Sequence, residues 1–343
     1  MKKIYEFLGL EKPITGDIGI EVEMEGRQLP DRVPRYWRVE GDGSLRNGGL
    51  EYVLKAPVNR GREERALKHL WSTFSATEAT LTPNSRCSVH IHINVQEFTK
   101  KQVFNFICLY LMAEDALVRW CGDGREGNLF CLRAKDAEYI INKLERTMHS
   151  DGIRELRSDR IRYAALNCKA LTEYGSLEFR AMRGPDNYGD ILTWINFLWC
   201  IREYALKADC PASLVNGFSE GGEDLFCREV FGEHFDTLFN YEGWDKEVYG
   251  GVRRCQVLAY EKDWSKDGEE EGLHDGIEGD WELKRAPEEG AVGLRSARRK
   301  ARVAEMSAEY RALREHGSPL MAAEARARHK KELEKWDILN PRV

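Results

Sequence analysis

The chain has no long hydrophobic run. Hydrophobic residues make up 42% of its 343 residues, yet the longest apolar stretch extends only from Val103 to Ala113 and includes Asn105. A transmembrane helix needs about 20 mainly apolar residues. The first residues are also too charged and too short for the core of a secretory signal peptide. We therefore expect no membrane span and a cytoplasmic location.

Two other features are missing. The nine cysteines are odd in number and contain no C-x-x-C pair, so a disulfide framework is not expected and a reducing compartment is favoured. An excess of positive charge is also absent, since the net charge is -6 and the isoelectric point is about 5.9. Proteins dedicated to binding nucleic acid are usually basic, so this partner is not expected.

Residues 17–183 contain strand patterns with helical patterns inserted irregularly between them. Alternating apolar and polar residues predict strands within 19–25, 35–57, 89–95, 162–167 and 175–183. Helical spacing predicts helices at 61–76, at 99–117 with Thr99 as cap, at 134–148 and from Pro185 onward. This arrangement favours an α+β fold over a βαβ repeat. Residues 211–260 fit no clear pattern.

The charge changes sign near the C-terminus. Residues 261–290 contain 12 acidic and 4 basic side chains, whereas residues 291–343 contain 13 basic and 7 acidic ones. We expect a catalytic domain over 1–260, an acidic flexible linker over 261–290 and a basic helical hairpin over 291–343. Packing of this hairpin on its own domain, on a second copy or on a protein partner is favoured over nucleic-acid binding.

Each predicted strand has one apolar face and one face with acidic, basic or imidazole side chains. The residues of the second kind are Glu21, Glu23, Glu51, His90, His92, Asn94, Glu178 and Arg180. Successive side chains of a strand point to opposite sides of a sheet. If these strands form one sheet, helices can cover the apolar side, and the other side becomes a concave acidic cleft.

Carboxylates that share a cleft repel each other unless cations neutralise them. Oxygen ligands with one histidine suit Mg²⁺ or Mn²⁺ better than structural zinc. Arg180 beside such carboxylates suits a phosphate group bridged by the metals. Each motif alone is common on a solvated strand, but the combination favours metal and phosphate chemistry.

The order of the motifs resembles the amidoligase family of phages and bacteria. The motifs are GIEVEME, DGSL, GLEYVLKAP, HIHINV, RYAALN and LEFRAMRG, all within residues 17–200. That family belongs to the superfamily of carboxylate–amine ligases that includes glutamine synthetase and glutamate–cysteine ligase. One departure is Ala56, where many relatives have serine before the proline, which affects a substrate contact and no metal ligand.

The resemblance implies a glutamine synthetase-like catalytic fold. In such a fold a curved, mainly antiparallel sheet has helices on its convex face and holds ATP with two or three Mg²⁺ or Mn²⁺ ions on its concave face. The resemblance implies that Glu21, His90 and Glu178 hold one metal near the γ-phosphate. Glu23 and Glu51 would hold another near the carboxylate to be activated.

The same resemblance implies residues for the nucleotide. His92 and Asn94, which share the face of His90, would contact the phosphates or the ribose of ATP. Arg162 and Arg180 would bind the nucleotide and neutralise the phosphoryl group during its transfer.

Four further residues are implied on the substrate side. Asp42 and Ser44 would bind the substrate, and Asp42 would deprotonate the attacking amine. Tyr163 and Asn167 are also expected to contact the substrate, although they can equally well finish a strand.

The implied reaction joins a small-molecule or peptide carboxylate to an amine through an acyl phosphate at the expense of ATP. Three alternatives use parts of the same pattern. A guanidino-type kinase would transfer the phosphoryl group to nitrogen, and a metal-dependent hydrolase would activate water. A non-catalytic scaffold or nucleic-acid-associated protein would act through the basic hairpin.

Overall fold

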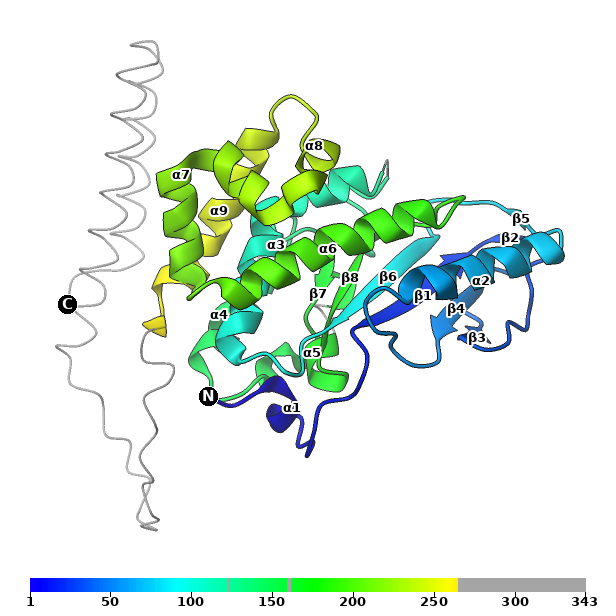
Figure 1. Cartoon of the computed structure of the whole chain (residues 1–343), viewed down its shortest axis with the longest axis horizontal. Coiled ribbons are helices and arrows are strands. Elements are labelled where there is room, and N and C mark those ends of the chain that lie inside the picture. The colour runs from blue at the N-terminus through cyan, green and yellow to red at the C-terminus, as the bar shows by residue number, and fades with distance from the viewer. Residues whose placement is uncertain (123, 138, 159–161, 265–343) are drawn as a thin grey trace. The chain divides into compact units, whose positions relative to one another are not determined.

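Six strands pair into one sheet in the part of the chain that the structure describes, which is residues 1–264 without 123, 138 and 159–161. In this computed structural model the strand order is β3-β4-β1-β6-β8-β7, and all neighbouring pairs are antiparallel (Figure 1). The strands are β1 (Ile18–Met24), β3 (Trp37–Glu40), β4 (Leu50–Leu54), β6 (Ser88–Asn94), β7 (Leu166–Asn167) and β8 (Ser176–Arg183). A separate two-stranded ribbon pairs β2 (Gly26–Arg27) with β5 (Thr80–Leu81).

Helices account for most of the remaining described chain. The α-helices are α1 (Ile4–Phe7), α2 (Glu63–Ala76), α3 (Lys100–Trp120), α4 (Tyr139–His149), α5 (Ala170–Glu173), α6 (Gly189–Lys207), α7 (Pro211–Phe231), α8 (Phe235–Leu238) and α9 (Trp244–Tyr260). The short 3₁₀ helices of the described residues include η1 (Arg154–Arg157) and η3 (Gly232–His234). The described part is thus a mixed α/β structure, as the strand and helix patterns predicted, with the mainly antiparallel sheet that the family resemblance implied.

Helices α2, α3 and α6 cover the apolar face of the sheet (Figure 1). The indole Nε1 of Trp37 in β3 donates to the carbonyl of Ala66 in α2 at 3.1 Å. The ring of Phe179 in β8 lies 5.5 Å from the ring of Phe106 in α3, measured between centroids. The alternate apolar residues of the central strands are buried, so burial of this face fixes which side chains remain on the other face.

Helices α7 and α9 pack on the far side of α3. Gly251 of α9 allows the closest approach, because a Cβ built there would lie 2.4 Å from the carbonyl oxygen of Met112 in α3. Arg254 of α9 donates to the carboxylate of Asp115 in α3 at 3.0 Å. In the described part, no helix combines the length and the apolar character that crossing a membrane requires.

Three boundaries differ from the sequence prediction. The helix expected from Pro185 begins at Gly189, because the Asn187 carboxamide accepts hydrogen bonds from the first helical N–H groups. The expected strand over 162–167 is shortened to β7, since residues 162 and 163 adopt a 3₁₀ conformation and Ala164 forms only an isolated parallel bridge with Leu132. The helix expected from residue 134 corresponds to α4, whose described residues begin at Tyr139.

Residues 211–260, which fit no sequence pattern, are mainly helical. Helix α7 is interrupted at Gly222, whose φ of +76° is left-handed, so its apolar residues follow no single helical period. The predicted acidic linker, apart from its first four residues, and the predicted basic hairpin lie outside the described residues.

Helix α3 begins with a capping box, and this gives a first prediction. Thr99 Oγ1 accepts the N–H of Gln102, and the Gln102 side chain accepts the N–H of Thr99. Thr99→Ala should lower the free energy of unfolding by about 1 kcal/mol, since the lost cap leaves a helix donor unsatisfied. Denaturant titration followed by circular dichroism measures this. Thr73→Ala inside α2 is the control, and an equal loss there would contradict the capping role.

Candidate metal centre on the polar face of the sheet

The polar side chains of four neighbouring strands meet on the face opposite the helices. The register places Glu21 of β1 directly opposite His90 of β6. It also places Glu23 of β1 directly opposite Glu51 of β4. On β8, Glu178 pairs with His92. The antiparallel register therefore gathers the acidic and histidine residues of separate motifs into one cluster.

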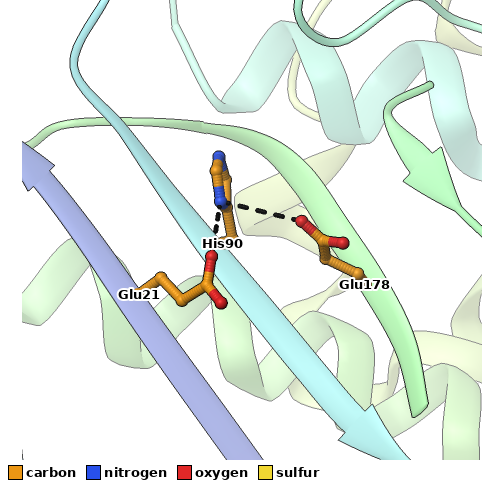
Figure 2. A group of neighbouring side chains, drawn as sticks. All are labelled: Glu21, His90 and Glu178. Carbon is orange, nitrogen blue, oxygen red and sulfur yellow. Dashed lines mark hydrogen bonds and ion pairs between the residues drawn. The ribbon is translucent and has the colours of Figure 1, made fainter. Parts of the chain in front are cut away.

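Glu21, His90 and Glu178 point toward one another from three adjacent strands (Figure 2). Nδ1 of His90 lies 3.0 Å from Oε2 of Glu21 and 3.7 Å from Oε1 of Glu178. One potential ligand atom from each residue lies within 4.8 Å of the others. Octahedral ligands of Mg²⁺ are about 2.9–4.1 Å apart, so this spacing is compatible with one shared ion.

A second group of the same kind consists of Glu23, Glu51 and His90. Nε2 of His90 lies 3.8 Å from Oε1 of Glu23 and 2.9 Å from the hydroxyl of Ser88. Ser88 in turn donates a short hydrogen bond to Glu23. His90 therefore stands between two carboxylate pairs, with one ring nitrogen directed to each.

Repulsion among the carboxylates is strongest at Glu51. Burial and the neighbouring negative charges raise the pKa of Glu51 to about 8. The charges that act on it belong to Glu21, Glu23, Asp42 and Glu40. A bound cation would remove the cost of ionising Glu51, because it favours the charged carboxylate. The donor set is thus chemically suited to a hard divalent ion.

The surroundings of Glu21 lower its pKa, in contrast to those of Glu51. Burial raises the pKa of Glu21, but the hydrogen bond from His90 and the close approach of His92 outweigh burial and lower it overall. His92 pairs through Nδ1 with the hydroxyl of Ser176 at 3.0 Å. Its Nε2 lies 3.4 Å from Glu21 and makes no hydrogen bond to any described residue. His92 thus lies within ion-pairing distance of Glu21 and contributes to the lowered pKa of that carboxylate.

Arg180 of β8 lies at the edge of the cluster. Its guanidinium donates a short hydrogen bond to Glu178, and Nη1 is 3.4 Å from Nδ1 of His90. Burial lowers the pKa of Arg180, but the adjacent Glu178 carboxylate raises it by more. A permanent positive charge therefore lies beside the first metal-compatible group, where it can bind a phosphate.

Two predicted contact residues are engaged with the protein itself. Nδ2 of Asn94 donates to the carbonyls of Ile14 and Gly16 at 3.1 and 2.7 Å. Nδ2 of Asn167 donates to Oε2 of Glu178 at 2.6 Å. Asn94 thus anchors the segment before β1, and buried Asn167 orients a potential metal ligand.

Asp42 and Ser44 lie on the turn between β3 and β4. Oδ1 of Asp42 accepts hydrogen bonds from the backbone N–H and the hydroxyl of Ser44. Burial raises the pKa of Asp42, but these bonds outweigh burial and lower it. Glu25 of the polar face ties this turn to the sheet, because it accepts the N–H of Arg46 at 2.8 Å. Hydrogen bonds from Arg86 lower the pKa of Glu25 to about 2.

Arg162 and Tyr163 lie beside the cluster and not within it. The guanidinium of Arg162 is 5.2 Å from the ring centroid of Tyr163, and that ring contacts Phe130. The carbonyl of Phe130 is 3.5 Å from Nε of Arg180. Tyr163 is 40% exposed and Leu129 is 74% exposed, so an accessible apolar rim borders Arg180.

A cavity of about 320 Å³ opens next to Glu21 and His92. Its wall includes Lys55, Ala56 and Pro57, and the ring of Tyr174 meets His92 edge-on at 5.9 Å. Sequence reasoning placed Glu25 on the polar face with Glu21 and Glu23, but it did not identify Ser88, Arg86, Tyr174 or Ser176 as part of this region. Ser176 lies on the polar face of a predicted strand, and Ser88 directly precedes the strand predicted over 89–95, with the same alternation as His90 and His92. This alternation was the available signal.

Residues 31–201 match a family model described as "putative amidoligase enzyme". The match includes the turn with Asp42, Glu51 of β4, His90 of β6 and Glu178 of β8, and it begins after β1. The chain belongs to this amidoligase family, which indicates a ligase that forms amide bonds. No curated protein matches the chain.

The cluster predicts metal binding that depends on named carboxylates. Glu21→Gln and Glu178→Gln should each weaken Mn²⁺ binding by at least about tenfold, because each removes a charged ligand. Electron paramagnetic resonance of free Mn²⁺ measures affinity and stoichiometry directly. Glu220→Gln on the exposed surface of α7 is the matched control. Unchanged affinity in both cluster variants would exclude a metal at this group.

Glu51 predicts a specific dependence of stability on pH. Its pKa is about 8 in the folded protein against an ordinary value of 4.5. The unfolded chain therefore loses this proton at lower pH than the folded protein does, and the stability of the metal-free fold falls as pH rises from 4.5 to 8. In EDTA, Glu51→Gln should therefore melt several degrees higher than the wild type at pH 8, at roughly 2–4 °C per kcal/mol. The difference should vanish near pH 4.5.

Thermal melts in EDTA and in Mn²⁺ test this. With Mn²⁺ the order should reverse, because only the wild type gains the full stabilisation from binding. A Glu51→Gln variant that is less stable than the wild type at pH 8 in EDTA would contradict the repulsion.

Proposed function

We propose that the chain is an ATP-dependent carboxylate–amine ligase that forms an amide or peptide bond. The observation that carries this proposal is the convergence of two metal-compatible groups on His90, with Arg180 beside them, in a member of the amidoligase family. The antiparallel sheet with helices on its apolar face is compatible with a glutamine synthetase-like fold.

The proposed reaction replaces the poor leaving group of a carboxylate with phosphate. A carboxylate reacts poorly with an amine because oxide would have to leave. Transfer of the γ-phosphoryl group of ATP to the carboxylate gives an acyl phosphate and ADP. The amine then attacks the carbonyl carbon, the C–O bond to phosphate breaks, and the amine loses a proton. The products are an amide, ADP and phosphate.

The metal-compatible groups would hold two or three Mg²⁺ or Mn²⁺ ions. Glu21, His90 and Glu178 would hold one, while Glu23 and Glu51 would hold another. Such ions supply charge neutralisation between the phosphates and the carboxylate. The raised pKa of Glu51 supports this assignment.

Arg180 would bind the phosphoryl group, with Arg162 able to approach from the exposed rim. The cavity beside His92 would accept part of the nucleotide, because the imidazole of His92, Lys55 and the Tyr174 ring line it and offer polar and aromatic contacts. The cavity wall would also keep water away from the acyl phosphate.

The turn at the other end of the cluster would bind the amine substrate. The pKa of Asp42 is lowered, so its carboxylate is ionised at neutral pH and is better suited to holding an ammonium group than to removing a proton from it. Ser44 fixes the orientation of this carboxylate. Tyr163 would contact the substrate only from the rim.

We propose a small-molecule or peptide carboxylate and an amine as partners, and self-association or a protein partner through residues 291–343. A cytoplasmic location accords with the nine free thiols, which disulfide-forming compartments disfavour.

Hydroxylamine provides a direct test, because it traps acyl phosphates as hydroxamates without knowledge of the natural amine. Purified protein with ATP, Mn²⁺, hydroxylamine and a pool of carboxylates should release ADP and form a hydroxamate. Arg180→Gln should lower this rate by about 10²-fold or more, since it removes a charge that stabilises the transferring group. The exposed Arg228→Gln on α7 is the control.

The outcomes separate the alternatives. ADP release that needs a guanidine acceptor and gives no hydroxamate indicates a kinase. Turnover without nucleotide indicates a hydrolase. Absence of both ADP release and hydroxamate across the carboxylate pools contradicts the ligase.

A further inference from the structure

A β-bulge interrupts β8 beside the cluster. Val89 of β6 pairs with Met182, whereas Ile91 pairs with Phe179, so β6 advances by two residues while β8 moves by three. Two residues of β8, Arg180 and Ala181, therefore stand opposite His90. A bulge of this kind disrupts the ladder locally and changes the direction of a side chain.

Arg125 supplies hydrogen bonds to the bulge. Its Nε donates to the carbonyl of Ala181 at 2.8 Å, and its Nη2 donates to the carbonyl of Arg180 at 2.7 Å. The side chain is 2% exposed and is among the largest fully buried side chains of the described part. A buried guanidinium that binds two consecutive carbonyls replaces ladder bonds with charge-assisted ones.

The opposite side of the bulge is also fixed. The backbone N–H of Arg180 donates to the carbonyl of Ala165 at 2.9 Å, next to β7. Arg180 is thus held through its N–H on one side and its carbonyl on the other. Since its Cα cannot shift without breaking both bonds, its guanidinium stays near His90 and Glu178.

Arg125 also fixes the loop that borders the site. Its carbonyl accepts from the N–H of Asn128 at 3.3 Å and from the thiol of Cys131 at 3.5 Å. The Asn128 side chain accepts the N–H of Phe130, whose carbonyl faces Arg180. The same residue therefore connects the loop, the bulge and the phosphate-binding arginine.

We propose that Arg125 is a positioning residue that holds Arg180 in the geometry for binding a nucleotide phosphate. The proposal rests on the proposed function, since it assumes that Arg180 contacts the nucleotide. Arg125 acts through the backbone of the bulge and has no contact with substrate in this role.

Fluorescence titration with mant-ATP and Mg²⁺ tests the proposal on the full chain. Arg180→Gln should weaken binding by about tenfold or more, as expected for loss of a charged hydrogen bond. Arg125→Met should weaken binding at least about fivefold, and Arg125→Lys should restore part of the loss. The Arg125→Met/Arg180→Gln double variant should bind no more weakly than Arg180→Gln. If Arg125 acts only through Arg180, the effects of the two substitutions on affinity are not additive.

Arg254→Met controls for general destabilisation, because it removes a mostly buried guanidinium between α9 and α3, away from the sheet. It should lower the melting temperature and leave the mant-ATP affinity unchanged. If Arg125→Met does not fold, Arg125→Gln replaces it, with weakened binding again expected.

Two results would overturn the positioning role of Arg125 and leave the proposed function of the chain intact. One is wild-type affinity in a folded Arg125→Met or Arg125→Gln variant while Arg180→Gln binds weakly. The other is a double variant in which the two losses multiply. Wild-type protein that binds no nucleotide, or an Arg180→Gln variant with unchanged affinity, overturns the assignment of Arg180 and the positioning role with it.

Discussion

The site depends on one constraint, which is the fixed register of the sheet. This register holds several carboxylates at cross-strand distance from one another. Glu23 lies opposite Glu51, and the reverse face of the same strands forms the core beneath α2, α3 and α6. A shift of one residue would expose that core. The backbone therefore cannot move to separate the charges. Relief has to come from a proton on Glu51, from the arginine beside Glu178 or from a cation.

The residues around the cluster limit how it can respond. Asn167 holds one oxygen of Glu178 and Arg180 takes the other, so this carboxylate has a fixed orientation. Ser88 links Glu23 to His90 in the same way. Supporting hydrogen bonds of this kind commonly determine how well a metal ligand is oriented. The described cluster is thus preorganised before any ligand enters.

The period-two pattern was enough to predict the cluster, because Glu21, Glu23, His90 and Glu178 alternate with residues that must be buried. Their register was not predictable, and only the register reveals that His90 is shared by both groups. The family resemblance implied that Asn94 and Asn167 contact ligands, yet both side chains hydrogen-bond to the protein itself. The sequence does not show which protein groups a carboxamide will meet in the fold. Arg125 was missed for a related reason. It follows glycines in an apparent surface turn, and only the fold brings the bulge to it.

The position of His90 has a consequence for how the two groups could bind cations. Nδ1 faces Glu21 and Glu178, whereas Nε2 faces Ser88 and Glu23. A neutral imidazole carries hydrogen on one ring nitrogen and a lone pair on the other. A neutral His90 would therefore offer a ligand atom to one group and donate a hydrogen bond in the other. The two groups are thus chemically unequal, although a single residue joins them.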